Sequence, residues 1–431
     1  MTYADTTRAE TLLAAERVRK GRQALAMTGG KERSFALLKM AQGLDARKEE
    51  IFRANAIDMD CEGDSNLKKR LKFDQSKLDD VIRGIKALAA MADPLERVDL
   101  RTELDEGLIL ERVATPIGVI AVIFESRPDA LPQIVSLCLK TGNAALLKGG
   151  REANYTNAVI FEIMQESIGE FADCFFLLRG REAVEAILSS AHGLVDLIIP
   201  RGSNALVSYI QENTKIPVLG HAEGICHIYI DKDCDKEKVL DVCLDAKISY
   251  PAACNAVETI LIHKEVKVEI IEALFALLES NNVELRLSPD LMEIGNRQGS
   301  REALEEDWRT EYGALIVSCR MVESLEHALD HINRYGSAHT EAIITENKAS
   351  WERFFAGCDS ASVYLNASTR FADGFRYGFG AEVGISTSRL VPRGPVGIDG
   401  LLSYKYKIMG NGQGVTAYSQ GRPFRHNNLL S

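Results

Sequence analysis

Four short, continuously apolar segments follow one another between residues 119 and 199, and segments with helical periodicity separate them. The predicted strands are 119–124, 144–148, 174–178 and 194–199, and the predicted helices between them are 130–140, 154–168 and 182–190. Strands that are apolar on both faces belong to a parallel sheet with helices on both sides. The sequence therefore predicts an α/β domain, and such sheets bind ligands beyond the carboxyl ends of their strands.

Turn-forming residues and cations follow three of these predicted strands. The segments are 125–128 (ESRP), 148–151 (KGGR) and 200–204 (PRGSN). Backbone N–H groups and the helix dipole at such turns favour an anion, so the pattern predicts a phosphate-bearing cofactor. The alternative is three ordinary loops with solvated charges. The chain contains no GxGxxG motif, so it lacks the common dinucleotide fingerprint.

The flanking regions extend this prediction in both directions. Residues 6–92 read as helices, with a core stripe at 78–89, and residues 99–113 read as a hairpin turning at Asp105-Glu106-Gly107. A second α/β unit has predicted strands at 228–230, 257–263, 315–317, 342–345 and 362–366, and predicted helices at 235–247, 266–279 and 323–334. Glycine is frequent between 374 and 400, a strand is predicted at 404–409, and the tail 418–431 reads as an arm or a loosely ordered segment.

Charge and cysteine usage exclude several classes of protein. The 431 residues carry a formal net charge of −11, which argues against a nucleic-acid partner. The nine cysteines are odd in number and include no CxxC pair, which favours reduced thiols in a cytosol. No apolar signal region follows Met1, and no apolar run reaches the roughly 18 residues of a membrane span. We therefore expect a cytoplasmic protein that contacts no membrane.

Cys254 is the candidate nucleophile among these cysteines. It lies in the segment 249–256 (SYPAACNA), where small neighbours leave room for a substrate to reach the sulfur. A catalytic cysteine acts as the thiolate. The alternative is a cysteine that serves as a small core residue, the more common role of this residue type.

The order of these parts resembles the aldehyde dehydrogenase superfamily and, within it, the gamma-glutamyl phosphate reductase family of proline biosynthesis. The segments that carry the resemblance are 53–58 (RANAID), 116–120 (PIGVI), 124–129 (FESRPD), 147–153 (LKGGREA), 199–203 (IPRGS), 218–227 (VLGHAEGICH), 250–256 (YPAACNA), 339–343 (HTEAI) and 393–397 (RGPVG). It extends nearly from end to end of the chain.

The resemblance implies an aldehyde dehydrogenase-like α/β fold with a Rossmann-like cofactor domain, an α/β catalytic domain and a small β oligomerisation flap. The implied parts are an NADP-binding domain (1–98 and 116–230), a catalytic domain with Cys254 (231–372), an oligomerisation ribbon or arm (99–115 and 403–431) and an active-site loop region returning to the cofactor domain (373–402). An exposed ribbon offers edge groups that a second copy can cover, so we expect a homodimer or homotetramer.

The implied activity is NADPH-dependent reduction of L-glutamyl 5-phosphate to L-glutamate 5-semialdehyde and phosphate. Cys254 matches the family's nucleophile, which expels phosphate and forms a thioester. The Cys254 backbone N–H is a candidate oxyanion donor. The resemblance also leaves open a functional coupling to glutamate 5-kinase. It implies no metal, and the neighbouring Cys226 and His227 would point to opposite faces of a strand rather than share an ion.

The same resemblance implies roles for residues around the nucleophile. The candidates for contact with the substrate, its phosphate or the oxyanion are Ser126, Arg127, Asn255, His221, Arg389 and Arg393. General aldehyde dehydrogenases have an asparagine where this chain has Ser126 and a water-activating glutamate where it has His221. A reductase that releases phosphate needs no hydrolytic water, so these replacements favour acyl-phosphate chemistry. Arg127, Arg389 and Arg393 have surface charges as their alternative role.

Cofactor contacts are implied for a further set of positions. They are Phe124, Glu125, Lys148, Gly149, Gly150, Arg151, Pro200, Arg201, Gly202, Ser203, Gly220, Glu223 and Glu311. Lys148 matches a lysine that contacts the cofactor ribose. Arg151 stands where NAD-dependent relatives often have an acidic residue, and an arginine there suits the 2′-phosphate of NADP(H).

Two other functions compete with this prediction. One is a hydrolytic NAD(P)-dependent aldehyde dehydrogenase, which would oxidise its aldehyde without phosphate. The other is a catalytically silent nucleotide-binding or interaction protein, in which replacing Cys254 would change no activity.

Overall fold

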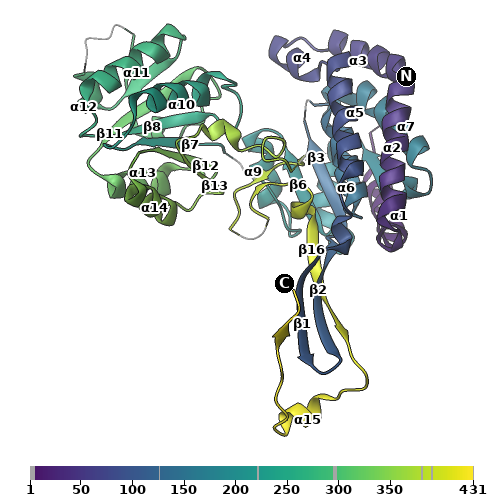
Figure 1. Ribbon diagram of the computed structural model, residues 1–431. Helices are drawn as coiled ribbons and strands as arrows, with labels where there is room; N and C mark the ends of the chain where they lie inside the picture. Colours follow the sequence, from purple (N-terminus) through teal and green to yellow (C-terminus); the bar gives the residue numbers. More distant parts are fainter. Residues whose placement is uncertain are drawn as a thin grey trace. The chain divides into compact units, whose positions relative to one another are not determined.

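The computed structural model describes residues 5–125, 127–220, 223–294, 299–379, 382–389 and 392–430, apart from the side chains of Ser65 and Asn66. The chain divides into two compact units (Figure 1). Unit 1 comprises Met1–Leu219, Phe379–Gly384 and Val396–Ser431, and unit 2 comprises Gly220–Gly378 and Ile385–Pro395. Each unit has its own sheet and its own hydrophobic core.

Unit 1 is built on the parallel sheet that the apolar segments predict. Its strands are β3 (Val119–Phe124), β4 (Ala144–Lys148), β5 (Phe175–Leu178) and β6 (Leu197–Arg201), in the spatial order β5-β4-β3-β6. The connecting helices are α6 (Ala130–Lys140), α7 (Asn154–Ile168) and α8 (Arg181–Ser190), and α9 (Asn204–Glu212) follows β6. All six residues of β3 are buried, as expected for a central strand covered on both faces.

Strand β6 begins three residues later than predicted. The carboxylate of Asp196 accepts a hydrogen bond from the Val119 N–H at 2.8 Å, and the same carboxylate binds Arg19. A side chain thus occupies the position at which a regular ladder would place a carbonyl oxygen. Regular pairing starts only at Leu197. It continues to Arg201, which pairs with Phe124, so Pro200 and Arg201 belong to the strand rather than to the loop after it.

The N-terminal helices pack on this unit as a separate layer. They are α1 (Arg8–Met27), α2 (Gly30–Ala46), α3 (Lys48–Cys61), α4 (Ser65–Leu71) and α5 (Gln75–Ala90), followed by the short η1 (Pro94–Glu96). A capping box between Thr7 and Glu10 starts α1. The predicted core stripe of α5 is confirmed, since Leu78, Val81, Ile82, Ile85, Leu88 and Ala89 are all buried.

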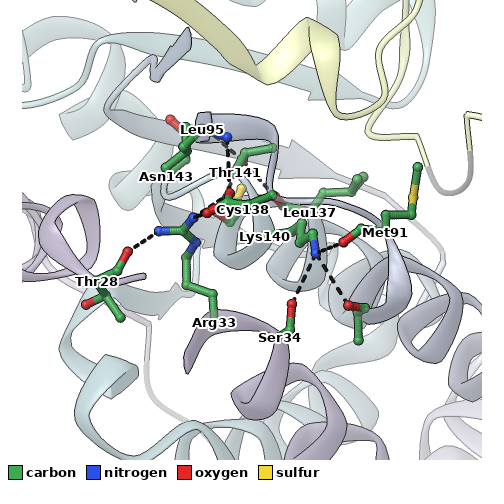
Figure 2. Close-up of polar contacts among 12 residues, drawn as sticks. Thr28, Arg33, Ser34, Met91, Leu95, Leu137, Cys138, Lys140, Thr141 and Asn143 are labelled. Carbon is green, nitrogen blue, oxygen red and sulfur yellow. Dashed lines mark hydrogen bonds and ion pairs between the residues drawn. The ribbon is translucent and has the colours of Figure 1, made fainter. Parts of the chain in front are cut away.

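Two buried cations are bound by the helix layer: Lys140 joins it to α6, and Arg33 joins α2 to the segments before it and after α5 (Figure 2). Lys140 lies at the end of α6, and its ammonium group contacts Ser34 Oγ at 3.1 Å and Met91 O at 2.5 Å. Arg33 on α2 donates to the Thr28 carbonyl and pairs with Asp93 at 2.6 Å. Burial lowers the pKa of Lys140. Each cation is surrounded by oxygen atoms, which compensates for its removal from water.

A β-ribbon extends from unit 1 and confirms the predicted hairpin (Figure 1). Strands β1 (Val98–Asp105) and β2 (Leu108–Pro116) are antiparallel and turn at Gly107, whose φ of 65° suits glycine. Strand β16 (Leu402–Met409) pairs with β2 along its whole length. The tail adds α15 (Val415–Ser419) and β17 (Asn427–Asn428), which pairs with β1.

This tail is more ordered than its polar sequence indicated. The Arg425 and Leu429 N–H groups donate to the carbonyls of Leu104 and Arg101, each at 2.8 Å. The acceptors lie on β1, more than 300 residues earlier, so no local pattern in the tail sequence could predict these hydrogen bonds.

Unit 2 contains a parallel sheet in the order β10-β9-β11-β8-β7-β12-β13. Its strands are β7 (Cys226–Ile230), β8 (Val257–His263), β9 (Glu284–Leu287), β10 (Arg301–Glu302), β11 (Ile316–Val322), β12 (Thr340–Ile344) and β13 (Ser362–Leu365). Its helices are α10 (Lys236–Ile248), α11 (Val268–Ser280), α12 (Pro289–Met292), α13 (Leu325–Tyr335) and α14 (Lys348–Gly357). A two-stranded antiparallel sheet joins β14 (Ile385–Ser386) to β15 (Gly394–Pro395).

The boundary between the units differs from the expected 230/231. Strand β7 pairs with β8 and β12, so it is a central strand of the unit 2 sheet and cannot belong to the cofactor domain. The boundary therefore falls at 219/220. The segment 373–402 is also divided, because 385–395 groups with unit 2 while 379–384 and 396–402 group with unit 1.

Candidate active site

Cys254 lies in the turn between α10 and β8 of unit 2. The turn is closed by hydrogen bonds from Ala253 N to Tyr250 O at 3.1 Å and from Ala256 N to Ala253 O at 2.8 Å. Proline at 251 and the small residues that follow keep this segment out of both the helix and the strand. Cys254 is partly exposed, whereas Asn255 and Ala256 are buried. The turn thus holds the sulfur where a substrate can reach it.

The backbone of Gly224 lies directly against the Cys254 turn. A Cβ atom on Gly224 would lie 2.6 Å from Cys254 Cα and closer still to the Cys254 carbonyl oxygen. No side chain fits at that separation, so this position requires glycine. Cys226, two residues further on, donates its thiol to the same carbonyl at 3.3 Å. The Cys254 turn is therefore supported by β7 and by the segment before it.

The backbone N–H of Cys254 donates to no acceptor among the described residues. A free N–H beside the sulfur is suited to stabilise an oxyanion on the carbon that the sulfur attacks. The role of this N–H as an oxyanion donor stays a prediction.

Asn255 has a different environment from the one expected for an oxyanion donor. Its side chain is buried, and its Nδ2 donates to the carbonyls of Ala372 at 2.9 Å and Arg370 at 3.4 Å. The hydroxyl of Thr369 donates to the Asn255 carbonyl at 2.7 Å. The Asn255 amide donates to the backbone of 370–372 and so fastens the Cys254 turn to η5 (Thr369–Phe371). These bonds direct the amide at the protein rather than at a substrate.

The described neighbours of Cys254 include one cation that sequence reasoning missed. Arg370, in η5, is 9% exposed and donates its Nε to Ser249 Oγ at 3.1 Å. Burial lowers the pKa of its guanidinium, with a contribution from Arg376, and the charge of Cys254 opposes that shift. The sequence alone gives little reason to place Arg370 beside Cys254, because Arg370 lies 115 residues beyond Asn255.

Most other cysteines are poor nucleophiles by comparison. Burial raises the pKa of Cys138, Cys174 and Cys358 to about 12, and that of Cys234 to about 11. Cys226, Cys243 and Cys319 are buried, and their pKa values are raised further by the same cause. Desolvation disfavours the thiolate, so these seven thiols stay protonated at neutral pH.

The strand ends of unit 1 bring the predicted cofactor residues of that unit to one edge of its sheet. Lys148 ends β4, and burial lowers the pKa of its ammonium group while Glu152 and Glu125 oppose the shift. Arg151 is exposed two residues beyond Gly149. A Cβ on Gly149 would contact the side chain of Asn157 and would lie 3.2 Å from the Phe124 ring. The two cations border a tightly packed glycine turn, an arrangement that fits a phosphate-bearing nucleotide.

One of the three predicted anion sites is filled by the protein itself. Glu125 Oε2 accepts from the Ser203 N–H at 2.9 Å, at the start of α9. A Cβ on Gly202 would contact the same carboxylate. The N-terminus of α9 is therefore already neutralised by Glu125, and a phosphate there would have to displace it.

The remaining cofactor candidates differ in what they can contact. Phe124 and Pro200 are buried within their strands, which leaves only backbone atoms for a ligand. Arg201 donates to the Glu382 carbonyl at 3.2 Å. Gly150, Gly220 and Glu311 are buried or partly buried, and Glu223 is exposed. Gly220, Glu223 and Glu311 belong to unit 2 rather than to the cofactor unit in which two of them were expected.

The proposed substrate cations of the late loop are paired with an acid. Arg393 Nη1 lies 2.9 Å from Asp359 Oδ1, and Arg389 lies 2.5 Å from Asp359 Oδ2. Arg389 is 82% exposed, so its ion pair is weak. Arg127 is also exposed. The predicted substrate residues Ser126 and His221 lie outside the described residues.

The fold and the thiol site together define an aldehyde dehydrogenase. The sequence model described as "Aldehyde dehydrogenase family" matches residues 1–295. A gamma-glutamyl phosphate reductase from a Synechococcus species is 48% identical over 428 residues, covering 97% of this chain and 95% of its own. One from Methanococcoides burtonii is 48% identical over 424 residues, covering 94% of each chain. The crystal structure of gamma-glutamyl phosphate reductase from Thermotoga maritima superposes with a TM-score of 0.90 at 35% identity, covering 94% of this chain and 99% of that one.

The chain therefore belongs to the aldehyde dehydrogenase family and, within it, to the gamma-glutamyl phosphate reductases. The family and the fold predicted from the sequence are confirmed. Aldehyde dehydrogenases use NAD or NADP. None of the described helices has the length and apolarity needed to cross a membrane.

Proposed function

We propose that this chain reduces L-glutamyl 5-phosphate to L-glutamate 5-semialdehyde and phosphate with NADPH, the second step of proline biosynthesis from glutamate. The observation that carries the proposal is Cys254 in a partly exposed turn, with a backbone N–H that donates to none of the described residues, in a chain 48% identical to gamma-glutamyl phosphate reductases. The enzyme is thus a phosphorylating glutamate-5-semialdehyde dehydrogenase when it runs in the oxidative direction.

The chemistry follows from the groups on the Cys254 turn. The thiolate attacks the acyl carbon, and the Cys254 N–H donates to the oxygen that becomes negative. The tetrahedral adduct breaks its bond to the phosphate oxygen, so phosphate leaves and a thioester remains. When bound, the dinucleotide supplies a hydride to the thioester carbon. The resulting thiohemiacetal releases the aldehyde and returns the thiolate.

NADPH oxidation with enzymatically generated glutamyl phosphate tests this proposal. The wild-type protein should oxidise NADPH at 340 nm only when the acyl phosphate is present. Cys254→Ala should lose turnover by at least about 10⁴-fold while still binding NADPH, because only the nucleophile is removed. Retained turnover in Cys254→Ala would contradict the assignment of Cys254. A wild type that is as inactive as Cys254→Ala would instead favour a silent binding protein.

A hydrolytic aldehyde dehydrogenase is the competing function. Oxidation of glutamate semialdehyde separates the two, because the reductase requires phosphate or arsenate to cleave its thioester and the hydrolytic enzyme does not. Activity in phosphate-free buffer would favour the competitor. The relatives support the reductase.

NADP(H) is the proposed cofactor, with Lys148 and Arg151 as the residues that would hold its phosphates and ribose. An exposed guanidinium can pair with the 2′-phosphate that NAD lacks. Arg151→Glu should raise the KM for NADPH about ten- to hundred-fold and leave the KM for NADH unchanged or lower. An unchanged KM for NADPH would remove Arg151 from the site.

We further propose a homo-oligomer, a dimer or tetramer, assembled through the ribbon, and a cytoplasmic location. Strand β16 is one of the two edge strands of the ribbon sheet, and Tyr404, Tyr406 and Ile408 on it are 54%, 60% and 59% exposed. An exposed apolar edge strand in a dissolved protein is an interaction site. Functional coupling to glutamate 5-kinase, which makes the acyl phosphate, remains part of the proposal.

A further inference from the structure

Arg370 is a mostly buried cation without an ionic partner among the described residues. Its guanidinium lies over the Tyr250 ring, with the guanidinium carbon 5.9 Å from the ring centroid. Its Nε donates to Ser249 Oγ at 3.1 Å. The described carboxylates form no ion pair with it, although Asp245 and Asp373 contribute to its electrostatic environment. Asp373 accepts instead from the N–H groups of Phe375 and Arg376.

The terminal nitrogens of Arg370 remain available to a ligand. Neither nitrogen donates a hydrogen bond to a described residue. Nor is either of them one of the fully buried polar atoms that have no hydrogen-bond partner. Both nitrogens therefore retain contact with solvent while the rest of the side chain is buried. A guanidinium fork held in this way is preorganised to bind a carboxylate or phosphate.

The segment that carries Arg370 is held against the nucleophile turn by three independent contacts. Thr369 Oγ1 donates to the Asn255 carbonyl, Asn255 Nδ2 donates to Ala372 O, and Arg370 Nε donates to Ser249. These contacts bracket Cys254 on both sides in sequence. The charge of Cys254 acts on Arg370, which agrees with this proximity.

A purely structural role explains these observations less well. Burying an arginine is unfavourable unless hydrogen bonds or an opposite charge compensate for it. Arg33 in unit 1 is compensated in that way by Asp93 and the Thr28 carbonyl, but the guanidinium of Arg370 donates only one hydrogen bond to a described residue, Ser249. A bound anion would supply the ion-pair partner that Arg370 lacks among the described residues.

We propose that Arg370 binds an anionic group of the substrate that acylates Cys254. The inference rests on the proposed function and adds a substrate-binding residue to it. Glutamyl 5-phosphate carries two such groups, the phosphate that leaves and the α-carboxylate at the other end. Both groups can present a pair of oxygens to a guanidinium. The reverse reaction distinguishes the two possibilities, because phosphate and glutamate semialdehyde are then added as separate substrates.

The experiment measures NADP⁺-dependent oxidation of glutamate semialdehyde by wild type, Arg370→Lys and Arg370→Gln. If Arg370 binds the leaving group, the KM for phosphate should rise about ten- to hundred-fold in Arg370→Gln while the KM for the semialdehyde changes less than twofold. If it binds the α-carboxylate, the KM for the semialdehyde should rise by that factor, and the preference over an aldehyde without an α-carboxylate should disappear. Arg370→Lys should recover part of either loss, because the charge is kept and the fork is removed.

A matched control and a binding measurement complete the test. Arg353 lies on α14 of the same unit, pairs with Glu326 and is 66% exposed, so Arg353→Gln should leave both KM values within twofold. Protection of Cys254 from iodoacetamide by phosphate or by glutamate reports binding without turnover. The ligand that protects the wild type should protect Arg370→Gln only at about ten- to hundred-fold higher concentration.

Two outcomes would overturn the inference. One is an active wild type with both KM values and the protection unchanged in a folded Arg370→Gln. The other is a variant that shifts only the pH profile of Cys254 alkylation, which would make Arg370 a partner of the thiolate rather than of the substrate. An inactive wild type would instead reject the proposed function itself. In that case, unchanged protection by both anions in Arg370→Gln would still count against the inference.

Discussion

At the residue scale, the geometry of the candidate active site depends on Gly224 as much as on Cys254. Gly224 has no side chain that could take part in the reaction, yet its backbone leaves no room for a Cβ beside the Cys254 carbonyl. The sequence places Gly224 in a family motif, but the reason for a glycine there appears only when β7 and the Cys254 turn lie side by side.

Gly224→Ala should therefore impair catalysis without abolishing folding. We expect turnover to fall at least about 100-fold, because a small displacement of a nucleophile has effects of that size. Gly84 in α5 is the matched control, since a Cβ there meets nothing within 4 Å. Gly84→Ala should keep full turnover and gain about 0.5–1 kcal/mol of stability from helix propensity. Equal activity in the two variants would contradict the packing argument.

His331 in α13 predicts a dependence of stability on pH. It is 2% exposed, its Nδ1 lies 2.9 Å from Arg320 Nη1, and burial lowers its pKa to about 2. The unfolded chain binds a proton near pH 6.5 and the folded chain does not. Stability is therefore complete above pH 6.5 and is lost as the pH falls below it.

When the pH falls from 8 to 5, protonation of this histidine in the unfolded chain should lower the free energy of unfolding by about 2 kcal/mol. Urea unfolding at the two pH values measures the loss, and His331→Gln should lose about 2 kcal/mol less than the wild type over the same interval. The comparison between pH values within one variant cancels the packing change that the substitution itself causes. Identical pH dependences would show that His331 titrates normally.

At the scale of elements, a buried ion pair joins α10 to β8. Lys247 Nζ lies 2.7 Å from Glu258 Oε2, and both side chains are almost completely buried. Burial raises the pKa of Glu258 to about 7 and lowers that of Lys247. Lys247 also contacts the Ala314 carbonyl, and Glu258 accepts from the Gly313 N–H at 3.3 Å. The pair thus connects the segments on both sides of Cys254 to the loop after Glu311.

Breaking this pair should be costlier than removing it. Glu258→Leu leaves an uncompensated buried ammonium group and should lower the unfolding free energy by about 3–5 kcal/mol at pH 7.5. Lys247→Met combined with Glu258→Leu removes both charges and should be within about 1–2 kcal/mol of the wild type. Urea unfolding of the single and double variants gives the coupling free energy. Additive losses would mean that the two groups do not interact.

Most elements were predictable because their patterns are local. The helices 130–140 and 154–168 and the strands 119–124 and 257–263 have the predicted bounds, since their apolar runs end at polar or turn-forming residues. Strands β9 and β10 were not predicted. They are short, their residues are largely polar, and they exist because they add to the edge of a sheet that is already formed.

At the scale of the whole molecule, the ribbon has an edge strand with exposed apolar side chains. Residues on β16 alternate between its two faces, so Tyr404, Tyr406 and Ile408 share one face, and Lys405 and Lys407 lie on the other. Lys407 contacts Glu111 on β2 at 3.2 Å. The face with Tyr404, Tyr406 and Ile408 is therefore the one on which we propose that a second copy packs.

Replacing Tyr404, Tyr406 and Ile408 together by lysine should dissociate the proposed oligomer. Light scattering at micromolar concentration should give the mass of a dimer or tetramer for the wild type and of a smaller species for the variant. Lys405→Ala, on the opposite face of the same strand, should keep the wild-type mass. A wild-type mass near 47.5 kDa, the mass of one chain, would contradict the proposal.

The sequence by itself determined the class of fold and the family, and it singled out Cys254 as the candidate nucleophile. Apolar runs and their periods are local properties, and burial converts them directly into strands and helices. The tertiary structure alone decided what surrounds Cys254. Gly224, Asn255 and Arg370 meet at the turn because β7 and β8 are neighbours and η5 is fastened to the turn between α10 and β8. Contacts over such sequence distances depend on strand order and loop paths, which no window of residues encodes.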